Sequence, residues 1–592
     1  MKTSARISKK MKNPYRKKVK NRIYMLIFLL IFWVVGIVFR LAQLQIINHD
    51  QSKAKVLEQN QNINVTYPKR GSIYDRRGNI LALSIPCYSV FYKSFKNETL
   101  ELQMEKIKRL KKILKLPPKE LELIRTRIEK NASFIWIKRK IDPEKSNKIL
   151  GLNIEGLYLT EENKRFYPNG KLAAHTLGQV NIDCEGYSGL EYKYNSILEG
   201  EKGKRLILRD AKRRKYRFET LKEPTSGKDL ILTIDKTIQY IAERELERAI
   251  QENNANWGTV IISIPQTGEI LAMADYPLHD LNNTAIEPRI ASRNRATQHI
   301  YSPGSTFKII TASAALESNT INPDDSFDCS KGSVYFAGKT FSDYKRFGVL
   351  SFPEVIIHSS NVGAIKIGEE VGKENLYNTI KAFGFGEKTG IDLPEEKGIF
   401  RTLNDWSNVS LASLSIGYEI SVTAIQTLQA INIIANKGKT CVPKVVKKVP
   451  ITPKKAKGFP VLYKRVISEE TALKLASILK EAVERGTGTA ARIDGYTAVG
   501  KTGTSQKFDP LIKRYSSASH TSSFVGFVQT ERPVFSIIVV IDDPKGQYYG
   551  SQVAAPLFKK IAVQVIRYLR IPPKKDHPEV YITAKYWEKN KR

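Results

Sequence analysis

An unbroken run of seventeen apolar residues, Ile23–Phe39, is the feature of this sequence that most restricts its fold. At 1.5 Å per residue, a helix over this run is roughly 26 Å long, close to the thickness of a bilayer's hydrocarbon core. A helix buried in a soluble core rarely lacks a polar face over such a length. A cleaved signal peptide would have a shorter apolar region followed by an A-x-A site, which is absent. The run therefore predicts one uncleaved transmembrane anchor over residues 23–43.

The residues before this run indicate how the anchor is oriented. Ten of the first 22 residues are Lys or Arg, and none is Asp or Glu. Basic segments of this kind stay on the cytoplasmic side of a membrane. We therefore expect residues 1–22 to form a cytoplasmic tail and everything after about Leu41 to be exported. No later segment is long and apolar enough to predict a second span.

The net charge of +37 over 592 residues points to an anionic partner. A membrane surface, an anionic polymer and nucleic acid are the three classes to consider. The basic residues beyond the tail are scattered and bring no zinc-finger or RNA-binding signature, so we expect no nucleic-acid partner. The cysteines show no CxxC spacing and the histidines no ligand motif, so we expect no metal site. An exported domain permits disulfides, but the sequence does not pair Cys87, Cys184, Cys329 and Cys441.

The length predicts two or three domains. Residues 44–225 mix short strands, turns and amphipathic helices, including a helix over Leu102–Leu116 that ends before a Pro-Pro pair. Residues 226–572 begin with a strand and a helix capped by Asp235, continue through a long helical middle, and return to strands before a last helix at Val553–Leu569. This order predicts an α+β domain followed by an α/β layered domain. Residues 573–592 are a polar, basic tail.

Three short motifs carry chemistry, but each occurs more than once. Context has to select among the copies of S-x-x-K, S-x-N and K-T-G, which begin at Ser52, Ser305, Ser342 and Ser477, at Ser292 and Ser359, and at Lys388 and Lys501. Ser305 alone combines a preceding Pro-Gly turn with a following apolar helix, which places Ser305 at a helix N-terminus and Lys308 one turn later on the same face. A plain N-cap serine is the alternative for this motif taken alone.

The other two motifs are chosen in the same way. Ser359 and Asn361 lie between two apolar helical stretches, where a loop aims a hydroxyl and an amide into a cleft. Lys501-Thr502-Gly503-Thr504 follows an extended run and suits a strand at a sheet edge, where Gly503 leaves room for a substrate backbone. Lys388-Thr389-Gly390 follows a helix in a Gly-rich loop and is better explained as a turn.

Taken together in this order, the three motifs make chemical sense as one site. A serine is a weak nucleophile and needs a base, and Lys308 serves only when it is neutral. Burial and a nearby cation such as Lys501 would lower its pKa from about 10.4. Ser359 would relay a proton, and Asn361 would hold a peptide amide. The motif set alone leaves open which group is the acylation base.

At these motifs the chain resembles the class B penicillin-binding proteins. The segments YSPGSTFK, SSNVG and GKTGTSQK look like that family's three active-site motifs, and RGSIYDRRGNILA, RFYPNGKLAAHTLGQV and GLEYKYNSILEG are similar to boxes of its membrane-proximal pedestal domain. NRATQHIYSPGSTFK, FGFGEKTGIDLP and SVTAIQTLQAINIIANKG resemble further boxes of the catalytic domain. The resemblance runs from the anchor to about residue 570. It implies a dimerisation-type pedestal at 44–225 and a β-lactamase-like transpeptidase domain at 226–572, with helices around a mainly antiparallel sheet.

The resemblance also implies roles for the site residues. Ser305 would be the acyl-enzyme nucleophile and Lys308 its base, with Ser359 and Asn361 completing the proton network and holding the donor peptide. Lys501, Thr502 and Thr504 would bind the donor carboxylate beside Gly503. The backbone N–H groups of Ser305 and Thr504 would form the oxyanion hole.

The implied reaction is cross-linking of peptidoglycan by a serine D,D-transpeptidase, without metal or cofactor. D-alanine leaves a D-Ala-D-Ala stem peptide, an amine of a second stem peptide resolves the ester, and β-lactams trap the serine. The stretch from GKTGTSQK to DDPKGQYYGSQVAAPLFKKI resembles the septal, cell-division type more than the elongation type. The implied partners are a lipid II polymerase of the shape, elongation, division and sporulation family and other divisome membrane proteins.

The sequence differs from the family's pattern at three positions, and three other functions remain as alternatives. Ser302 stands where the family's septal type usually has Glu, Arg77 where the pedestal box has Asn, and Ser551 where a glycine is usual. A carboxypeptidase or β-lactamase would use the same motifs but rarely carries such a pedestal and anchor. A non-catalytic scaffold that activates a polymerase is the second alternative, and an elongation-type enzyme is the third.

Overall fold

The computed structural model describes residues 14–47, 61–95, 97–209, 215–283, 293–452, 455–458, 463–509 and 514–573. These residues form two compact units, Met1–Tyr67 with Lys202–Thr225, and Pro68–Glu201 with Ser226–Arg592. Each unit is described by itself below.

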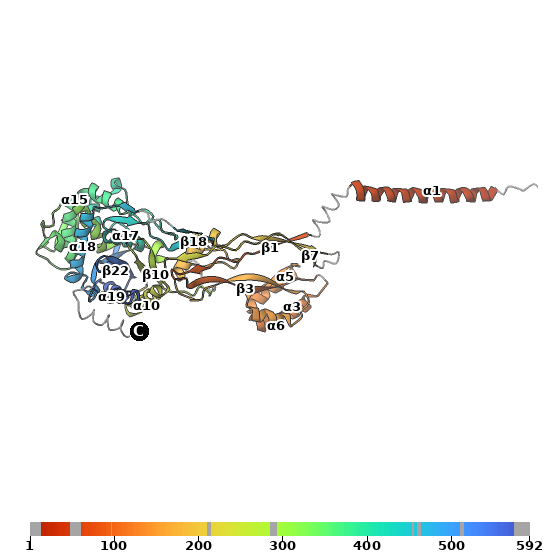
Figure 1. The fold of residues 1–592 in the computed structure, drawn as a ribbon, viewed down its shortest axis with the longest axis horizontal. Helices are drawn as coiled ribbons and strands as arrows, with labels where there is room; N and C mark the ends of the chain where they lie inside the picture. Colours follow the sequence, from red (N-terminus) through yellow and green to blue (C-terminus); the bar gives the residue numbers. More distant parts are fainter. Residues whose placement is uncertain are drawn as a thin grey trace, which may run out of the picture. The chain divides into compact units, whose positions relative to one another are not determined.

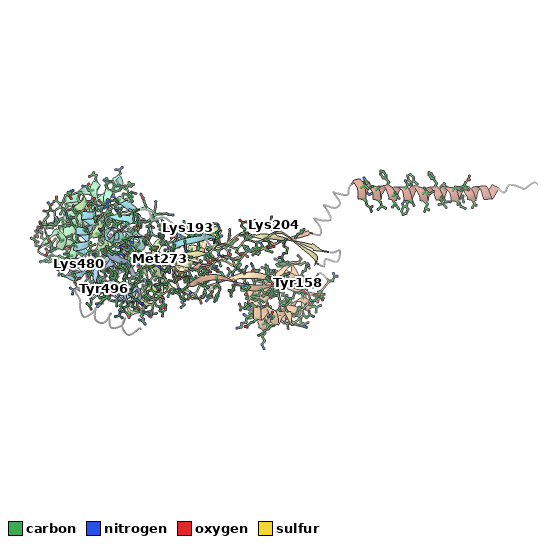
Figure 2. The ribbon with its side chains drawn as sticks, viewed as in Figure 1. Tyr158, Lys193, Lys204, Met273, Lys480 and Tyr496 are labelled. Atoms are coloured by element: carbon green, nitrogen blue, oxygen red, sulfur yellow. The ribbon has the colours of Figure 1, made fainter. Side chains whose placement is uncertain are left out.

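The first unit contains the predicted anchor. Helix α1 spans Pro14–Ala42, and a π-helical turn follows at Gln43–Ile47. The stretch Asn21–Ala42 has a mean hydropathy of 2.6, and in the described part of the chain it is the one helix long and apolar enough to cross a membrane. Its side chains project from all sides of the helix (Figure 2). The same unit holds the antiparallel strands β1 (Gln61–Thr66), β6 (Gly203–Arg209) and β7 (Lys215–Lys222).

In the second unit, one sheet joins the segment before residue 202 to the segment after residue 225. Its strands are β2 (Ile73–Tyr74), β3 (Ile80–Tyr92), β4 (Ile135–Ile141), β5 (Leu157–Phe166), β8 (Leu230–Leu232), β18 (Val446–Thr452) and β19 (Lys455–Gly458). Strand β8 pairs in parallel with β2 and antiparallel with β18. The two parts of this unit are therefore connected by continuous backbone hydrogen bonding.

Helices cover one face of strands β3–β5. They are α3 (Leu100–Lys108), α4 (Lys111–Leu114), α5 (Pro118–Glu129) and α6 (Pro143–Leu150), and their apolar faces pack on Val90, Tyr92 and Ile135. The single helix expected over Leu102–Leu116 is wrong. Helix α3 ends at Lys108, and α4 ends at Leu114, where the capping residue Lys115 adopts the left-handed region.

Three sequence boxes of this part meet at one buried ion cluster. Glu191, on helix α8 (Gly189–Lys193), accepts from Arg70 at 2.7 Å and from Arg165 at 2.6 Å, and all three side chains are at most 2% exposed. Arg70 also donates to Glu191 O, and Arg165 donates to Gly71 O. Buried charges are tolerated only when they are paired and hydrogen-bonded in this way. The cluster fixes the β2–β3 hairpin against α8.

The larger part of the unit is built on the expected antiparallel sheet, which is confirmed. Among the described residues its five strands run in the order β10 (Ile270–Tyr276), β9 (Trp257–Ser263), β23 (Pro533–Asp542), β22 (Arg514–Gln529) and β21 (Thr497–Asp509). Two of these strands, β10 and β22, are labelled in Figure 1. Strand side chains alternate between the two faces, so that Ile261 and Ile262 enter different cores. Strand β21 lies at the edge of this sheet.

Helices pack on both faces of the sheet. Helix α10 (Lys236–Glu252) and the last helix α19 (Ala554–Leu569) cover one face, and α10 begins where Asp235 accepts from the N–H groups of Thr237 and Ile238, as predicted. The other core contains α13 (Lys308–Glu317), α14 (Phe352–His358), α15 (Asn361–Ala382), α16 (Ser410–Ser415), α17 (Ala424–Ala435) and α18 (Glu469–Glu484). The N-termini of α13 and α15 approach the edge strand β21, where the candidate site lies.

Candidate active site

Ser305 lies in a short 3-10 turn, Gly304–Phe307, that leads directly into α13. This turn packs on the edge strand, because a Cβ on Gly304 would lie 2.8 Å from the backbone oxygen of Thr504. Gly304 also has a φ of +54°, which side chains other than glycine rarely adopt. The turn thus holds Ser305 between α13 and β21, partly exposed in a cleft.

Lys308 is completely buried one turn after Ser305. Its Nζ donates to the backbone oxygen of Ser359 at 2.6 Å and to Oδ1 of Asn361 at 2.8 Å, with Ser359 Oγ farther away at 3.4 Å. Burial lowers the pKa of the Lys308 amine to about 7, although the carboxylate of Asp343 acts in the opposite direction. A substantial fraction of Lys308 is therefore neutral near pH 7.

These contacts leave the amine ready to accept a proton. A neutral lysine has two N–H donors and one lone pair, and the two short bonds to Ser359 and Asn361 use both donors. Among the described residues, no hydrogen bond joins the Ser305 hydroxyl to Lys308. The lone pair of a neutral Lys308 is free to take a proton from a hydroxyl that approaches it.

The S-x-N motif occupies the junction between α14 and α15. Ser359 ends α14 with a φ of +60°, and Ser360 caps α15 through the N–H of Gly363. The Asn361 side chain donates to the backbone oxygen of Ser342 at 2.8 Å while its Oδ1 accepts from Lys308. The amide is thereby fixed in one orientation.

Asp343 holds this junction in place, and sequence analysis did not single it out. Its Oδ2 accepts from the Ser360 hydroxyl at 2.8 Å, and its Oδ1 accepts from the N–H groups of Asn361 and, at 3.2 Å, Val362. It thus caps the first turn of α15. No motif identified it because Asp343 precedes Ser359 by sixteen residues and meets it only through the fold.

The K-T-G motif lies on the edge strand β21, as expected. Lys501 is fully buried, and both burial and the charge of Lys308 lower its pKa. Thr502 hydrogen-bonds through its hydroxyl to Thr487 at 2.7 Å, and the Thr504 hydroxyl accepts from the N–H of Gly550 at 2.9 Å. A Cβ on Gly503 would lie 2.3 Å from Ser523 Oγ and 2.8 Å from a methyl of Thr306, so only glycine fits.

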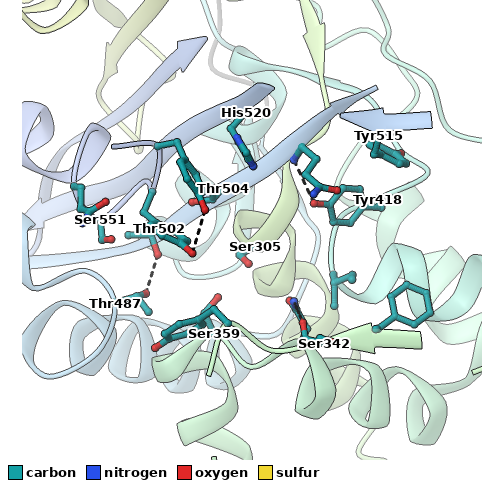
Figure 3. Close-up of a pocket in the computed structure, with 18 of the residues that line it drawn as sticks. Ser305, Ser342, Ser359, Tyr418, Thr487, Thr502, Thr504, Tyr515, His520 and Ser551 are labelled. Atoms are coloured by element: carbon teal, nitrogen blue, oxygen red, sulfur yellow. Dashed lines mark hydrogen bonds between the residues drawn. The ribbon is translucent and has the colours of Figure 1, made fainter. Parts of the chain in front are cut away.

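The cleft over these residues has a volume of about 780 Å³. Figure 3 shows Ser305 between Ser359 on one side and Thr502 and Thr504 of β21 on the other. Polar and aromatic side chains line the walls, among them Phe341, Tyr344, Tyr418, Tyr515, His520 and Tyr548. Lys308 and Lys501 lie beneath this surface.

The remaining copies of the S-x-x-K, S-x-N and K-T-G motifs do not supply the catalytic groups of this cleft. Ser477 is exposed on α18, and Lys388-Thr389-Gly390 lies in an irregular segment in which Thr389 donates to Glu395. Ser342 ends strand β14 (Lys339–Ser342), which pairs with β13 (Ser333–Phe336) and lines the cleft. Ser52 and Ser292 lie outside the described residues.

The three departures noted in the sequence all lie within the described part of the chain. The backbone oxygen of Ser302 accepts from the Ser505 hydroxyl at 2.6 Å, and Ser551 lines the cleft. Arg77 pairs with Asp235 at 3.0 Å and lies over the ring of Tyr568. Within the described part of the chain, no three His, Cys, Asp or Glu side chains form a group that would hold a metal ion.

Two family models match the chain. The penicillin-binding protein transpeptidase domain matches residues 258–562, and the penicillin-binding protein dimerisation domain matches residues 65–232.

Curated and solved proteins agree with these matches. The chain is 36% identical to stage V sporulation protein D of Bacillus subtilis, over 86% of this chain and 80% of that protein. It is 30% identical to peptidoglycan D,D-transpeptidase FtsI of Escherichia coli, over 90% of this chain and 89% of that protein. The structure of penicillin binding protein 3 from Mycobacterium tuberculosis, complexed with aztreonam, is 26% identical, with a TM-score of 0.67 over 87% of this chain and 99% of that chain.

Proposed function

Because the chain belongs to the penicillin-binding proteins that combine a dimerisation domain with a transpeptidase domain, we propose that it is a serine D,D-transpeptidase that cross-links peptidoglycan. The observation that carries the proposal is the buried amine of Lys308, which is held by Ser359 and Asn361 next to the turn that bears Ser305. A hydroxyl nucleophile and a neutral amine base are what acyl transfer at neutral pH requires.

The first half of the reaction forms an acyl-enzyme. Neutral Lys308 accepts the proton of Ser305 as its Oγ attacks the carbonyl carbon of the penultimate D-alanine. The N–H groups of Ser305 and Thr504 stabilise the oxyanion. When the intermediate collapses, the C–N bond breaks, and the amine of the departing D-alanine receives a proton through Lys308 and Ser359.

The second half transfers the acyl group. An amine of a second stem peptide attacks the ester carbonyl, loses its proton to the same network, and expels Ser305, which is reprotonated. Asn361 orients the donor peptide, and Thr502 and Thr504 hold its terminal carboxylate above the buried amine of Lys501. Gly503 lets the donor backbone lie close to β21. A β-lactam enters the same path and leaves a slowly resolved ester on Ser305.

The setting of this activity follows from the anchor. We place the N-terminal tail in the cytoplasm, α1 across the cytoplasmic membrane, and the catalytic cleft outside it, where peptidoglycan is made. The likeness to FtsI favours work at the division septum, with a lipid II polymerase and other divisome membrane proteins as partners. A fluorescent fusion that concentrates at midcell supports this assignment, and one spread along the side wall contradicts it.

Labelling with a fluorescent penicillin tests the catalytic proposal. The full-length protein is expected to give a stable adduct that peptide mapping assigns to Ser305, and Ser305→Ala is expected to give none. Ser477→Ala, which changes an exposed S-x-x-K serine on α18, is the matched control and should label normally. Rapid turnover without an adduct would instead indicate a hydrolase, and folded protein that never reacts would indicate a scaffold.

A further inference from the structure

One end of the cleft carries an aromatic pair that the proposed acyl transfer does not use. In the described part of the chain, β22 pairs with β23 only from Thr521 onward, so that before this residue β21 and β22 form a two-stranded ribbon. Phe508 of β21 and Tyr515 of β22 are direct partners on this ribbon, and their ring centroids lie 5.5 Å apart. We call these two side chains the aromatic arm.

Contacts with Tyr418 attach the aromatic arm to the cleft. The ring centroids of Tyr515 and Tyr418 lie 4.9 Å apart with their planes nearly perpendicular, and the Tyr418 hydroxyl accepts from the N–H of Gln506 at 3.3 Å. Tyr418, Gln506 and Tyr515 all line the cleft that contains Ser305. Figure 3 shows Tyr418 and Tyr515 together at one end of this cleft. The arm is therefore a continuation of the cleft wall.

The exposure of the aromatic arm points to a ligand. Phe508 is 52% exposed, and Tyr515 is half-buried. A single exposed apolar residue needs no explanation, because folded proteins expose many of them. Two packed rings that extend a cleft are different, since cavities lined by aromatic side chains and a few polar groups are where small ligands bind.

The proposed reaction sets the direction in which the donor runs from the nucleophile. Thr502 helps to hold the terminal carboxylate, and the N–H of Thr504 stabilises the oxyanion. The acyl part of the donor therefore has to run from Thr504 away from Thr502. In that direction along β21 come Gln506, which lines the cleft, and then Phe508. The donor thus extends toward the aromatic arm.

The length of the donor places its sugar at the arm. A stem of five residues is joined through its N-terminus to the lactyl group of N-acetylmuramic acid, so that four residues remain on the acyl side once D-alanine has left. Extended at roughly 3.3 Å per residue, they span about 13 Å. The strand from Thr504 to Phe508 rises by four residues and covers about the same length. The group that reaches the arm is therefore the muramyl sugar.

A sugar suits this surface better than a further peptide segment does. The two faces of a pyranose ring carry C–H bonds, whose partial positive charge is attracted to the negative face of an aromatic ring. Its hydroxyl groups project from the rim of the ring and remain in water. An added peptide strand would instead need free backbone groups along the sheet edge, and the N–H of Gln506 is already bonded to the Tyr418 hydroxyl.

We propose that Phe508 and Tyr515 form a subsite for the muramyl sugar of the donor strand. The inference rests on the proposed function, since it takes the direction of the donor from the acyl transfer to Ser305. The two rings stack on the sugar and do not touch the reacting atoms, so they determine which donors bind rather than how fast Lys308 accepts a proton. The enzyme would thereby favour stems that are attached to a glycan over free peptides.

The test compares two donors as competitors of a fluorescent penicillin on the full-length protein. One donor is muramyl pentapeptide, and the other is the same pentapeptide with an acetyl group in place of the sugar, so that the N-terminus is uncharged in both. The readout is the donor concentration that halves the initial rate at which Ser305 is labelled. The muramyl donor is expected to need a several-fold lower concentration than the acetylated donor.

Three variants assign this preference to the arm. Phe508→Ala should bring the two concentrations together, because it removes the exposed ring. Phe508→Tyr keeps a ring at the same position and should keep the preference. Tyr240→Ala is the matched control, since it removes a tyrosine that is 54% exposed on α10 and does not line the cleft, and it should also keep the preference.

Two results would overturn the sugar subsite. One is equal inhibition by the two donors in the unchanged protein, and the other is a preference that survives in Phe508→Ala, including an equal loss of inhibition for both donors. Labelling of Ser305 without any donor reports on the catalytic proposal separately. Protein that labels normally but that neither donor protects would contradict the proposed peptidoglycan substrate, and the sugar subsite with it.

Discussion

The Nζ of Lys308 lies 2.8 Å from Oδ1 of Asn361, so the amide that is expected to hold the donor peptide also fixes the amine that is expected to act as base. One side chain therefore couples substrate binding to proton transfer. Because Asn361 also donates to Ser342, its orientation cannot reverse without breaking both bonds.

Acylation is expected to depend on the protonation of Lys308. Its pKa is lowered to about 7 by burial, and only the neutral amine accepts the serine proton, so the rate should fall as pH drops below about 7. Well below that value the loss should be about tenfold per pH unit. Stopped-flow measurement of acylation by a penicillin between pH 5 and 9 gives this pH dependence of the rate. A rate that stays constant down to pH 5 would remove Lys308 as the base.

Asp343→Asn is expected to move the pH below which acylation slows to a lower value, because it removes the carboxylate that raises the pKa of Lys308. The amide oxygen still accepts from the α15 backbone, so the cap is retained in part. The pH profile of acylation separates this electrostatic role from a purely structural one.

The control for Asp343→Asn is Asp328→Asn, which removes an exposed carboxylate from β12 (Ser326–Asp328). For Asp328→Asn, the acylation rate should fall over the same pH range as in the unchanged protein. If Asp343→Asn lowers the acylation rate equally at every pH and leaves its pH dependence unchanged, Asp343 acts only as a cap of α15.

Gly503→Ala is expected to abolish most acylation and to destabilise the protein by about 1–3 kcal/mol. The added Cβ would press on Ser523 Oγ and Thr306 and force β21 away from the turn that carries Ser305. Penicillin labelling and urea unfolding measure the two effects. Gly348→Ala places its Cβ in open space and should change neither, whereas full labelling of Gly503→Ala would contradict the tight packing described here.

Glu191→Gln is expected to lower the free energy of unfolding by about 3–5 kcal/mol, because it leaves two buried guanidinium groups without a counter-charge. Urea denaturation gives the value. Glu105→Gln removes an exposed partner of Arg109 and should cost no more than about 0.5 kcal/mol. Equal losses in the two variants would mean that the buried cluster contributes little.

Local patterns in the sequence predicted the elements that local interactions determine. Asp235 caps α10 through its own neighbours, and the last helix follows the strands as expected. The motif turns at Ser305 and Ser359 also follow from short-range signals.

Local sequence patterns did not predict the contacts between residues far apart in the chain. Nothing near Asp343 indicates that its carboxylate will meet the N-terminus of α15, and no pattern at residues 333–342 predicted the hairpin whose second strand lines the cleft. The joining of β2, β8 and β18 in one sheet brings together residues separated by hundreds of positions. Pairings of that kind depend on the whole fold and leave no periodic signal.

The burial of Lys308 and Lys501 has an evolutionary consequence. An amine without water around it destabilises a folded chain, so an apolar side chain at either position would make this protein more robust to heat and to further mutation. If selection acted on the stability of the fold alone, it would therefore replace both lysines with apolar residues. Their presence in this sequence marks two positions where chemistry, rather than folding, decides which amino acid is kept.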